Sequence, residues 1–303
     1  MTKEQVTPMT VAVLGPGGIG GLLAALLSRA GHRVICLAGD ETARTLRADG
    51  MRVRSGPFGD FMARVEADTE LREPVDACLI AVKATALDAA LQRVPVNAPG
   101  DGLLVPFLNG VEHPAALRER YGPSRVAPAV IRVESTRVAP GLIEHDSPFA
   151  EVDLTGETVG REQLDALAGA LAGTGIGTRV QDGEAATLWA KMSFLAPLAL
   201  LTTRYGLPLG DVRTLHREEL TALAEETAAV STACGAPADP AAALARYDSF
   251  PHGTKSSMQR DAEAGRPLEL DAIGGALLRA AERYGVPVPV ASGLVRELAA
   301  TGR

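Results

Sequence analysis

Lysine and asparagine are scarce in this chain of 303 residues. Of its 30 basic residues, 26 are arginine and four are lysine, and asparagine occurs only twice. A GC-rich genome, which writes arginine wherever any cation serves, explains the excess of arginine. Each remaining lysine or asparagine is therefore a candidate for a role that requires its particular side chain. These residues are Lys3, Lys83, Lys191, Lys255, Asn97 and Asn109.

Other absences narrow the class of protein. Three cysteines, an odd number, argue against a disulfide framework, and without a CxxC motif or a histidine pair at ligand spacing no structural metal is expected. No apolar run reaches the ~20 residues that span a bilayer, and the opening segment MTKEQVTPMT has no apolar signal core. A net charge of −7 with scattered cations disfavours nucleic acid and anionic membranes as partners. We therefore expect a cytoplasmic globular protein.

The distribution of strand and helix patterns predicts two domains, as the length does at roughly 150 residues per domain. In the first half, short β-branched runs alternate with helical stretches, and runs that are apolar on both sides, such as residues 78–82, indicate a parallel sheet covered by helices. We expect a doubly wound α/β domain over residues 1–182 and an all-helical domain over residues 183–303.

The expected elements can be given by residue number. Strands are expected at residues 10–14, 33–38, 77–82, 103–108, 126–133, 141–144 and 151–154, with helices at 18–30, 41–49, 87–93 and 114–121. Residues 51–53 and 61–66 read as a hairpin around the turn at 56–59. Helices of the second domain are expected at 184–203, 213–234, 240–247, 256–264, 271–284 and 291–300.

A glycine-rich segment follows the first expected strand and opens the first expected helix. Its GxGxxG pattern consists of Gly15, Pro16, Gly17, Gly18, Ile19 and Gly20. The first glycine permits a tight turn, the second lets the backbone approach a pyrophosphate, and the third lets the helix pack on the strand. The position in a first βαβ unit favours a dinucleotide site over a plain strand-to-helix turn.

The end of the second strand bears on which dinucleotide is bound. An acid there accepts hydrogen bonds from a free ribose 2′-hydroxyl, whereas a cation binds a 2′-phosphate. Asp40 lies where such an acid belongs, but it equally suits the N-cap of the next helix. Arg44, one turn into that helix, can reach back towards a phosphate. The sequence leaves both readings open.

Two of the scarce residues stand at carboxyl ends of buried strands, where ligands bind in open α/β sheets. Lys83 follows the strand at residues 78–82, and Asn109 follows the next strand. Lys191 lies on the first helix of the second domain, and Lys255 adjoins Ser257. Lys255 is expected to be a surface neighbour of Ser257, and Lys3 to belong to the tail.

Six segments in this order resemble the ketopantoate reductase (2-dehydropantoate 2-reductase) family. They are the GxGxxG, Val82-Lys83-Ala84, Leu108-Asn109-Gly110, the Trp-x-Lys helix ending at Lys191, Ser256-Ser257-Met258 and Arg266-Pro267-Leu268-Glu269-Leu270-Asp271. The resemblance extends to residues 285–289, nearly the whole chain. It implies a Rossmann-type domain followed by a helical domain, NADPH-dependent reduction of a small 2-oxo acid in a cleft between them, and a homodimer.

The resemblance also implies roles for single residues. Lys191 would be the general acid and contact the substrate, with Glu269 as its partner or that of the cofactor ribose. Asn109 would contact cofactor and substrate, Ser257 the substrate carboxylate, and Lys83 would bind cofactor and balance charge. The chemistry agrees, because hydride addition to a ketone makes an alkoxide that needs a proton and nearby positive charge. Lysine supplies both, whereas arginine does not release its proton.

The chain departs from the family pattern at four positions. Leu195 and Ala199, one and two turns after Lys191, replace asparagines that face the substrate, and Leu209 replaces a third. We therefore expect a more apolar pocket, for which 2-dehydropantoate is not the best substrate. Gly39 replaces the arginine expected after strand two, so NAD(H) stands beside NADP(H) as cofactor. The alternative functions are reduction of another carbonyl or an imine, and a dinucleotide-binding sensor without turnover.

Overall fold

The computed structural model describes residues 7–301, so Lys3 lies outside the described residues. The chain divides into two compact units. The N-terminal unit comprises the chain up to Leu108 together with His113–Glu184, and the C-terminal unit comprises Asn109–Glu112 together with the chain from Ala185. This division falls two residues after the predicted boundary at residue 182. The assignment of Asn109–Glu112 to the second unit has no counterpart in the sequence pattern.

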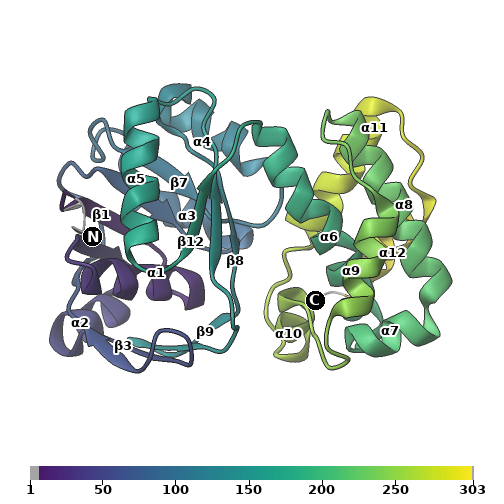
Figure 1. The fold of residues 1–303 in the computed structure, drawn as a ribbon, viewed down its shortest axis with the longest axis horizontal. Coiled ribbons are helices and arrows are strands. Elements are labelled where there is room, and N and C mark those ends of the chain that lie inside the picture. Colours follow the sequence, from purple (N-terminus) through teal and green to yellow (C-terminus); the bar gives the residue numbers. More distant parts are fainter. Residues whose placement is uncertain (1–6, 302–303) are drawn as a thin grey trace, which may run out of the picture. The chain divides into compact units, whose positions relative to one another are not determined.

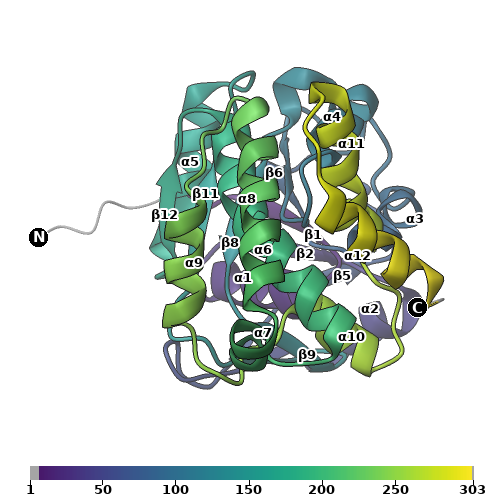
Figure 2. The ribbon, with the colours of Figure 1, turned by 90° about the vertical axis from the view of Figure 1, so that its right-hand side faces the viewer.

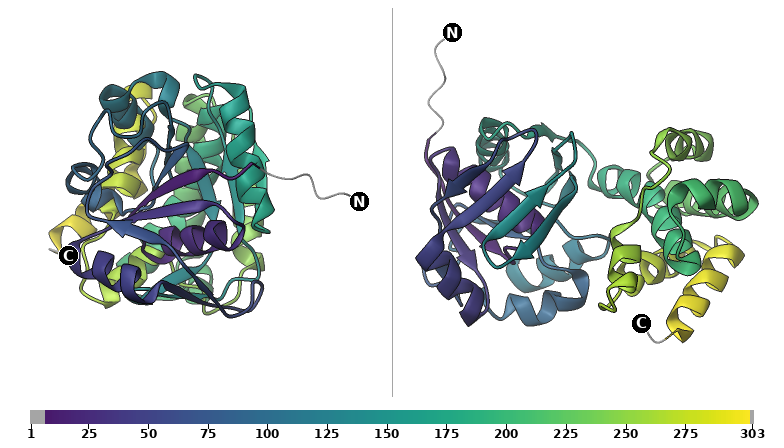
Figure 3. Two further views of the ribbon diagram at one scale, coloured as in Figure 1. Left: turned by 90° about the vertical axis from the view of Figure 1, so that its left-hand side faces the viewer. Right: turned by 90° about the horizontal axis from the view of Figure 1, so that it is seen from below.

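The N-terminal unit is built on a five-stranded parallel sheet with the order β5-β2-β1-β6-β7 (Figure 3, left). Its strands are β1 (Thr10–Leu14), β2 (Arg33–Leu37), β5 (Glu66–Asp68), β6 (Ala77–Ile80) and β7 (Leu103–Pro106). The chain runs outward from β1 through β2 to β5 and then returns to the other side of β1 with β6 and β7. The predicted doubly wound α/β fold is confirmed, and its topological switch point lies between β1 and β6.

Helices surround this sheet because its strands are apolar on both faces. The side chains of Cys78, Leu79 and Ile80 have no exposed surface. The helical elements of the unit are α1 (Gly18–Arg29), α2 (Asp40–Asp49), η1 (Ala84–Ala86), α3 (Leu87–Leu91), α4 (His113–Tyr121), η2 (Pro123–Arg125) and α5 (Arg161–Gly173). They are labelled in part in Figure 1.

Two smaller sheets complete the N-terminal unit. One has the order β4-β3-β10-β9 and consists of β3 (Met51–Ser55), β4 (Phe61–Ala63), β9 (Ser135–Ala139) and β10 (Leu142–His145). The other has the order β12-β11-β8 and consists of β8 (Ala129–Arg132), β11 (Glu151–Leu154) and β12 (Gly177–Val180). Helix α1 contacts β3, β9 and β10, so it lies between the first small sheet and the central one.

The predicted hairpin at residues 51–53 and 61–66 is correct only in its first part. Strands β3 and β4 pair antiparallel, but β4 ends at Ala63. Glu66 begins β5, which pairs with β2 as the edge of the central sheet, and its carboxylate binds Arg33 at the start of β2. The pattern of residues 61–66 does not reveal that the chain passes from one sheet to another there, because strands in both sheets show the same alternation.

Among the strands and α-helices that the structure describes, β9, α5 and β12 have no counterpart in the predicted elements. Helix α5 begins after Gly160, which provides no side-chain cap, so the usual start signal is missing. Strand β12 is half-exposed and begins with glycine. Helix α5 buries Leu164, Leu167 and Leu171 in the core of the unit, and β12 is held by its pairing with β11.

The C-terminal unit is helical, as predicted (Figure 2). Its elements are α6 (Glu184–Tyr205, which begins on the last residue of the N-terminal unit), α7 (Leu209–Leu215), α8 (Arg217–Ala233), α9 (Pro240–Ser249), α10 (Ser257–Glu263), the π-helical turn η3 (Asp271–Gly275), α11 (Ala276–Tyr284) and α12 (Pro289–Ala300). By length and composition α6 is apolar enough to span a membrane, but 67% of its most apolar window is buried inside the structure. Its residues from Trp189 to Leu201 form much of the unit's core.

Two predicted helices of this unit are broken in the structure. The helix expected at 213–234 is two helices, α7 and α8, which meet at His216. The ring of His216 stacks on Tyr205 with a distance of 3.5 Å between ring centroids, and this contact holds the break in place. The helix expected at 271–284 begins with the π-helical turn η3 and becomes α-helical only at Ala276.

Candidate active site

The glycine loop after β1 leaves no room for side chains at several positions, and two of them pack within the loop and its neighbouring segment. Gly15 has a φ of +84°, and a Cβ built on it would lie 2.5 Å from Cγ1 of Val82. A Cβ on Gly20 would overlap the carbonyl oxygen of Gly15. The loop after β1 therefore packs directly against the segment after β6, at the switch point of the sheet.

The same loop leaves open space where a ligand would approach. Gly17 is the N-cap of α1 without any side-chain capping bond, and nothing lies closer than 4.0 Å to a Cβ built on it. No acidic residue occupies the first turn, which begins with Gly18 and Ile19, and Pro16 before it is buried. The N–H groups of this turn and the positive end of the helix suit an anion such as a pyrophosphate. The residues present therefore fit a dinucleotide.

Ser135 positions the first turn of α1, a role that the sequence does not reveal. Its hydroxyl donates a hydrogen bond to the carbonyl oxygen of Gly18 at 2.9 Å, and a Cβ on Gly18 would overlap the carbonyl oxygen of Ser135. The two residues are 117 positions apart. A local pattern contains no sign of such a contact.

Replacing Gly20 with alanine is expected to weaken nicotinamide dinucleotide binding at least tenfold and to destabilise the protein by about 1–3 kcal/mol, because the new methyl group overlaps a backbone atom. Titration of the cofactor and thermal unfolding would measure the two effects. Gly169→Ala on α5 is the matched control, since nothing lies within 4 Å of its Cβ position and alanine favours a helix. An unchanged dissociation constant in Gly20→Ala would show that the loop does not hold the cofactor.

Lys83 lies beside the glycine loop, as its position after the buried strand predicts. It is exposed and directly precedes η1, and its carbonyl oxygen accepts a hydrogen bond from the N–H of Ala86. Its neighbour Val82 is the residue that faces Gly15. The structure thus brings Lys83 and the GxGxxG to the same switch point of the N-terminal unit.

The structure at the end of β2 decides one of the two predicted roles of Asp40, that of helix N-cap. The N-cap of α2 is Gly39, and Asp40 is the first residue of the helix, exposed and without a capping bond. The N-cap prediction for Asp40 is therefore wrong, because the helix begins one residue earlier than expected. Arg44 is exposed, and its Nε donates to the carbonyl oxygen of Asp40 at 3.3 Å. A Cβ built on Gly39 would have Nη2 of Arg93 as its nearest neighbour, at 3.9 Å.

In the C-terminal unit, Asn109 and Glu269 bind each other across 160 residues of sequence. Nδ2 of Asn109 donates a hydrogen bond to Oε2 of Glu269 at 2.8 Å. The side chain of Glu269 is largely buried, and Glu269 lies two residues before the turn η3. Two of the six segments noted in the sequence, Leu108–Gly110 and Arg266–Asp271, are thereby joined in one place.

Further contacts anchor the segment of Asn109 to this unit. Gly110 has a φ of +90°, and a Cβ on it would lie 2.5 Å from the carbonyl oxygen of Ala272 in η3. Glu112 forms an ion pair with Arg279 at 2.7 Å, and Asp271 binds the same guanidinium at 2.7 Å. These contacts explain why residues 109–112 belong to the C-terminal unit. They also hold Asn109 in a fixed position towards Glu269.

Lys191 stands on α6 with a half-buried side chain, between core residues Trp189 and Met192. Leu195, one turn later, is also half-buried. Ala199, two turns later, has no exposed surface and belongs to the apolar core of the unit. Leu195 is therefore the better placed of these two substitutions to face a substrate.

The segment around Ser257 is tied to the same helix. Ser256 is the N-cap of α10 and accepts a hydrogen bond from the N–H of Gln259, while its hydroxyl bonds that of Thr202 on α6 at 2.8 Å. Ser256 therefore takes the structural role, and Ser257 beside it is left exposed. Lys255 forms a surface ion pair with Glu263 at 2.8 Å, which confirms its prediction as a surface neighbour of Ser257.

Family models match both units of the chain. The model described as "Ketopantoate reductase PanE/ApbA" matches residues 11–154, and the model described as "Ketopantoate reductase PanE/ApbA C terminal" matches residues 185–301. The chain belongs to the ketopantoate reductase family. The resemblance found in the six sequence segments is thus confirmed over nearly the whole length.

Individual relatives and solved structures agree with this assignment. The 2-dehydropantoate 2-reductase of Mycobacterium tuberculosis is 30% identical, with 96% of this chain and 97% of the relative covered. "Uncharacterized oxidoreductase YkpB" of Bacillus subtilis is 29% identical, with 93% and 95% covered. The crystal structure of 2-dehydropantoate 2-reductase from Methylococcus capsulatus superposes with a TM-score of 0.87 at 25% identity, covering 97% of this chain and 96% of that one.

The protein is therefore an oxidoreductase acting on CH–OH groups, and its cofactor is a nicotinamide dinucleotide. The glycine loop of the N-terminal unit provides the cradle that such a cofactor needs. The predicted site residues divide between the units. The GxGxxG and Lys83 lie in the first, and the C-terminal unit holds Asn109, Lys191, Leu195, Ala199, Ser257 and Glu269.

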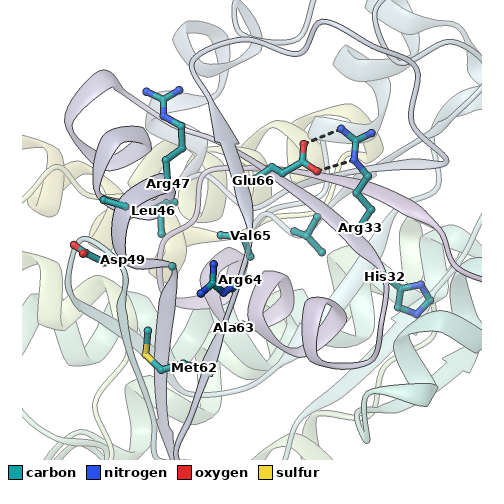
Figure 4. Close-up of a pocket in the computed structure, with 13 residues that line it drawn as sticks. His32, Arg33, Leu46, Arg47, Asp49, Met62, Ala63, Arg64, Val65 and Glu66 are labelled. Carbon is teal, nitrogen blue, oxygen red and sulfur yellow. Dashed lines mark hydrogen bonds and ion pairs between the residues drawn. The ribbon is translucent and has the colours of Figure 1, made fainter.

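A cavity of about 640 Å³ lies elsewhere in the N-terminal unit, at the amino end of β2 (Figure 4). It is lined by the start of β2, the last turns of α2 and the residues from Met62 to Glu66. Figure 4 shows the guanidinium of Arg33 bound to Glu66 beside it. The cavity shares no residue with the predicted site, since it faces the amino end of β2 and the glycine loop faces the carboxyl ends.

Proposed function

We propose that the protein reduces a 2-oxo acid to the corresponding 2-hydroxy acid with NADPH, with Lys191 as the general acid. The observation that carries this proposal is the hydrogen bond from Asn109 to Glu269, in the unit that also holds Lys191. A dinucleotide-binding sensor needs only the glycine loop. A carboxylate–amide pair built from two distant segments, in the unit that also holds Lys191, is more than a sensor requires, and it supports a catalytic role.

In the proposed mechanism the glycine loop would hold the nicotinamide dinucleotide, which when bound would supply the hydride for the carbonyl carbon. Lys191 donates a proton from Nζ to the carbonyl oxygen, and its positive charge offsets the negative charge that develops there. Ser257 binds the substrate carboxylate through its exposed hydroxyl. Glu269 orients the amide of Asn109 by accepting its N–H, so that the amide presents a fixed group to cofactor and substrate.

The substrate side chain is proposed to be apolar. Leu195 lies one turn after Lys191 on the same helix and is half-buried, where the family pattern places an amide. A leucine offers no hydrogen bond to a hydroxylated substrate, and a desolvated hydroxyl without a partner costs about 1–3 kcal/mol. Branched or aromatic 2-oxo acids should therefore be reduced more efficiently than 2-dehydropantoate.

A comparison of kcat/KM for 2-dehydropantoate and for branched and aromatic 2-oxo acids tests the proposed substrate class. Leu195→Asn is expected to raise the ratio of kcat/KM for 2-dehydropantoate to that for an apolar 2-oxo acid about tenfold, which corresponds to ~1.4 kcal/mol. Leu215→Asn is the matched control, because Leu215 lies on α7 with 66% of its surface exposed, and it should leave the ratio unchanged. A wild-type preference for 2-dehydropantoate by a wide margin would refute an apolar pocket.

We also propose that the protein works in the cytoplasm as a homodimer. All three cysteines are free thiols, which supports a reducing compartment. Burial raises the pKa of the Cys36 and Cys78 thiols to about 12, so that both stay protonated and inert in the core.

A further inference from the structure

The guanidinium of Arg93 lies close to Gly39, the position after β2 where the family pattern has an arginine. Gly39 has no side chain, and the nearest atom to a Cβ built on it is Nη2 of Arg93, at 3.9 Å. Arg93 follows α3 and is half-buried. Its Nη1 donates to the carbonyl oxygen of Thr69, just after β5, at 2.8 Å. A guanidinium from another part of the chain is thus fixed at the carboxyl end of β2.

Among the residues that the structure describes, no carboxylate forms an ion pair with Arg93. Its Nη1 donates to the neutral carbonyl of Thr69, whereas Arg72 close by binds Asp68 at 3.1 Å. The carboxylate of Asp68 is fully engaged, since its other oxygen accepts the N–H of Thr69 at 2.6 Å. A half-buried guanidinium with spare donors and no counter-charge is a binding site for an anion.

We propose that Arg93 binds the 2′-phosphate of NADPH and sets the preference for NADPH over NADH. In doubly wound folds the ribose 2′ position lies at the end of the second strand, where an arginine accommodates a phosphate. The guanidinium fork suits phosphate oxygens, and Arg44, one turn into α2, provides a second exposed guanidinium near the same strand end. The inference deepens the proposed function, since it rests on the same dinucleotide site.

Direct binding measurements test this role without requiring turnover. NADPH and NADH are titrated into the protein in the absence of substrate, and their dissociation constants are compared for the wild type and Arg93→Gln. The wild type is expected to bind NADPH more tightly. Arg93→Gln retains a donor for the carbonyl of Thr69 but loses the charge, and it should raise the dissociation constant of NADPH about 10- to 100-fold while changing that of NADH less than about threefold.

Two further variants separate the role of Arg93 from a general loss of charge or structure. Arg47→Gln removes another guanidinium that donates to a backbone carbonyl. Arg47 lies in the last turn of α2, near the amino end of β2, so this change should leave both dissociation constants unchanged. Adding Gly39→Arg to Arg93→Gln places a guanidinium on the β2 loop itself, where φ is −67°, and should restore tight NADPH binding.

Two results would overturn the proposal. One is a wild type that binds NADH as tightly as NADPH, which would favour Asp40 as a partner of the ribose hydroxyl. The other is an Arg93→Gln variant that keeps the wild-type ratio of the two constants. Failure of the proposed function would show differently, as tight and selective NADPH binding without reduction of any 2-oxo acid.

Discussion

Replacing Lys191 with alanine is expected to lower kcat for 2-oxo acid reduction by about 10²- to 10⁴-fold, the usual contribution of a positioned general acid. Alanine neither donates a proton to the carbonyl oxygen nor offsets the charge that develops on it. The dissociation constant of NADPH should change less than about threefold, because the glycine loop that holds the dinucleotide belongs to the other unit. Steady-state kinetics and cofactor titration of the same preparation measure both effects.

Lys191→Arg separates the two functions of the ammonium group. Arginine keeps the positive charge but does not release its proton at working pH, so a partial loss of kcat is expected, together with loss of any pH dependence that Lys191 contributes. Lys255→Ala is the surface control, since it removes only the ion pair with Glu263 and should leave kcat unchanged. Turnover of Lys191→Ala at the wild-type rate would assign the proton donor to another group.

The central sheet, apart from its edge strand β5, could be predicted from the sequence because its signal is local. Strands such as β1 and β6 are apolar on both sides, and they match the predicted residues closely. The helix break and the unpredicted strand discussed next have no such local signal in the sequence. The helix break at His216 depends on a ring contact with Tyr205, and β9 is stabilised by pairing with β10 and by packing against α1. Pattern alone therefore predicts the architecture and misses the elements that depend on distant partners.

The same distinction holds for the candidate site. The GxGxxG is a local motif, and the structure gives each glycine the conformation or the space that the motif requires. The contact between Asn109 and Glu269 follows from the sequence only through the order of the family segments. Ser135 beneath Gly18 and Arg93 beside Gly39 have no motif at all, because each comes from a segment that folds back over many residues.

Replacing Asp153 with alanine is expected to destabilise the N-terminal unit by about 1–3 kcal/mol, because it removes a buried carboxylate that accepts three hydrogen bonds. Asp153 lies on β11 and is only 4% exposed. Oδ2 accepts from Arg132 at 2.6 Å, and Oδ1 accepts from Arg179 at 2.8 Å and from Gln181 at 3.1 Å. Urea unfolding at neutral pH measures the loss. Asp165→Ala removes an exposed ion pair with Arg161 and should cost less than about 1 kcal/mol.

The same carboxylate makes the stability depend on acid. Burial alone would raise the pKa of Asp153, but the hydrogen bonds from Arg179, Arg132 and Gln181 outweigh it and hold the pKa below its ordinary value. The unfolded chain therefore binds a proton at a higher pH than the folded protein does. The stabilisation is fully present above the unfolded pKa of about 3.9 and is lost as the pH falls through the folded value. Asp153→Asn should remove this part of the acid dependence, and a variant with an unaltered acid unfolding profile would contradict the assignment.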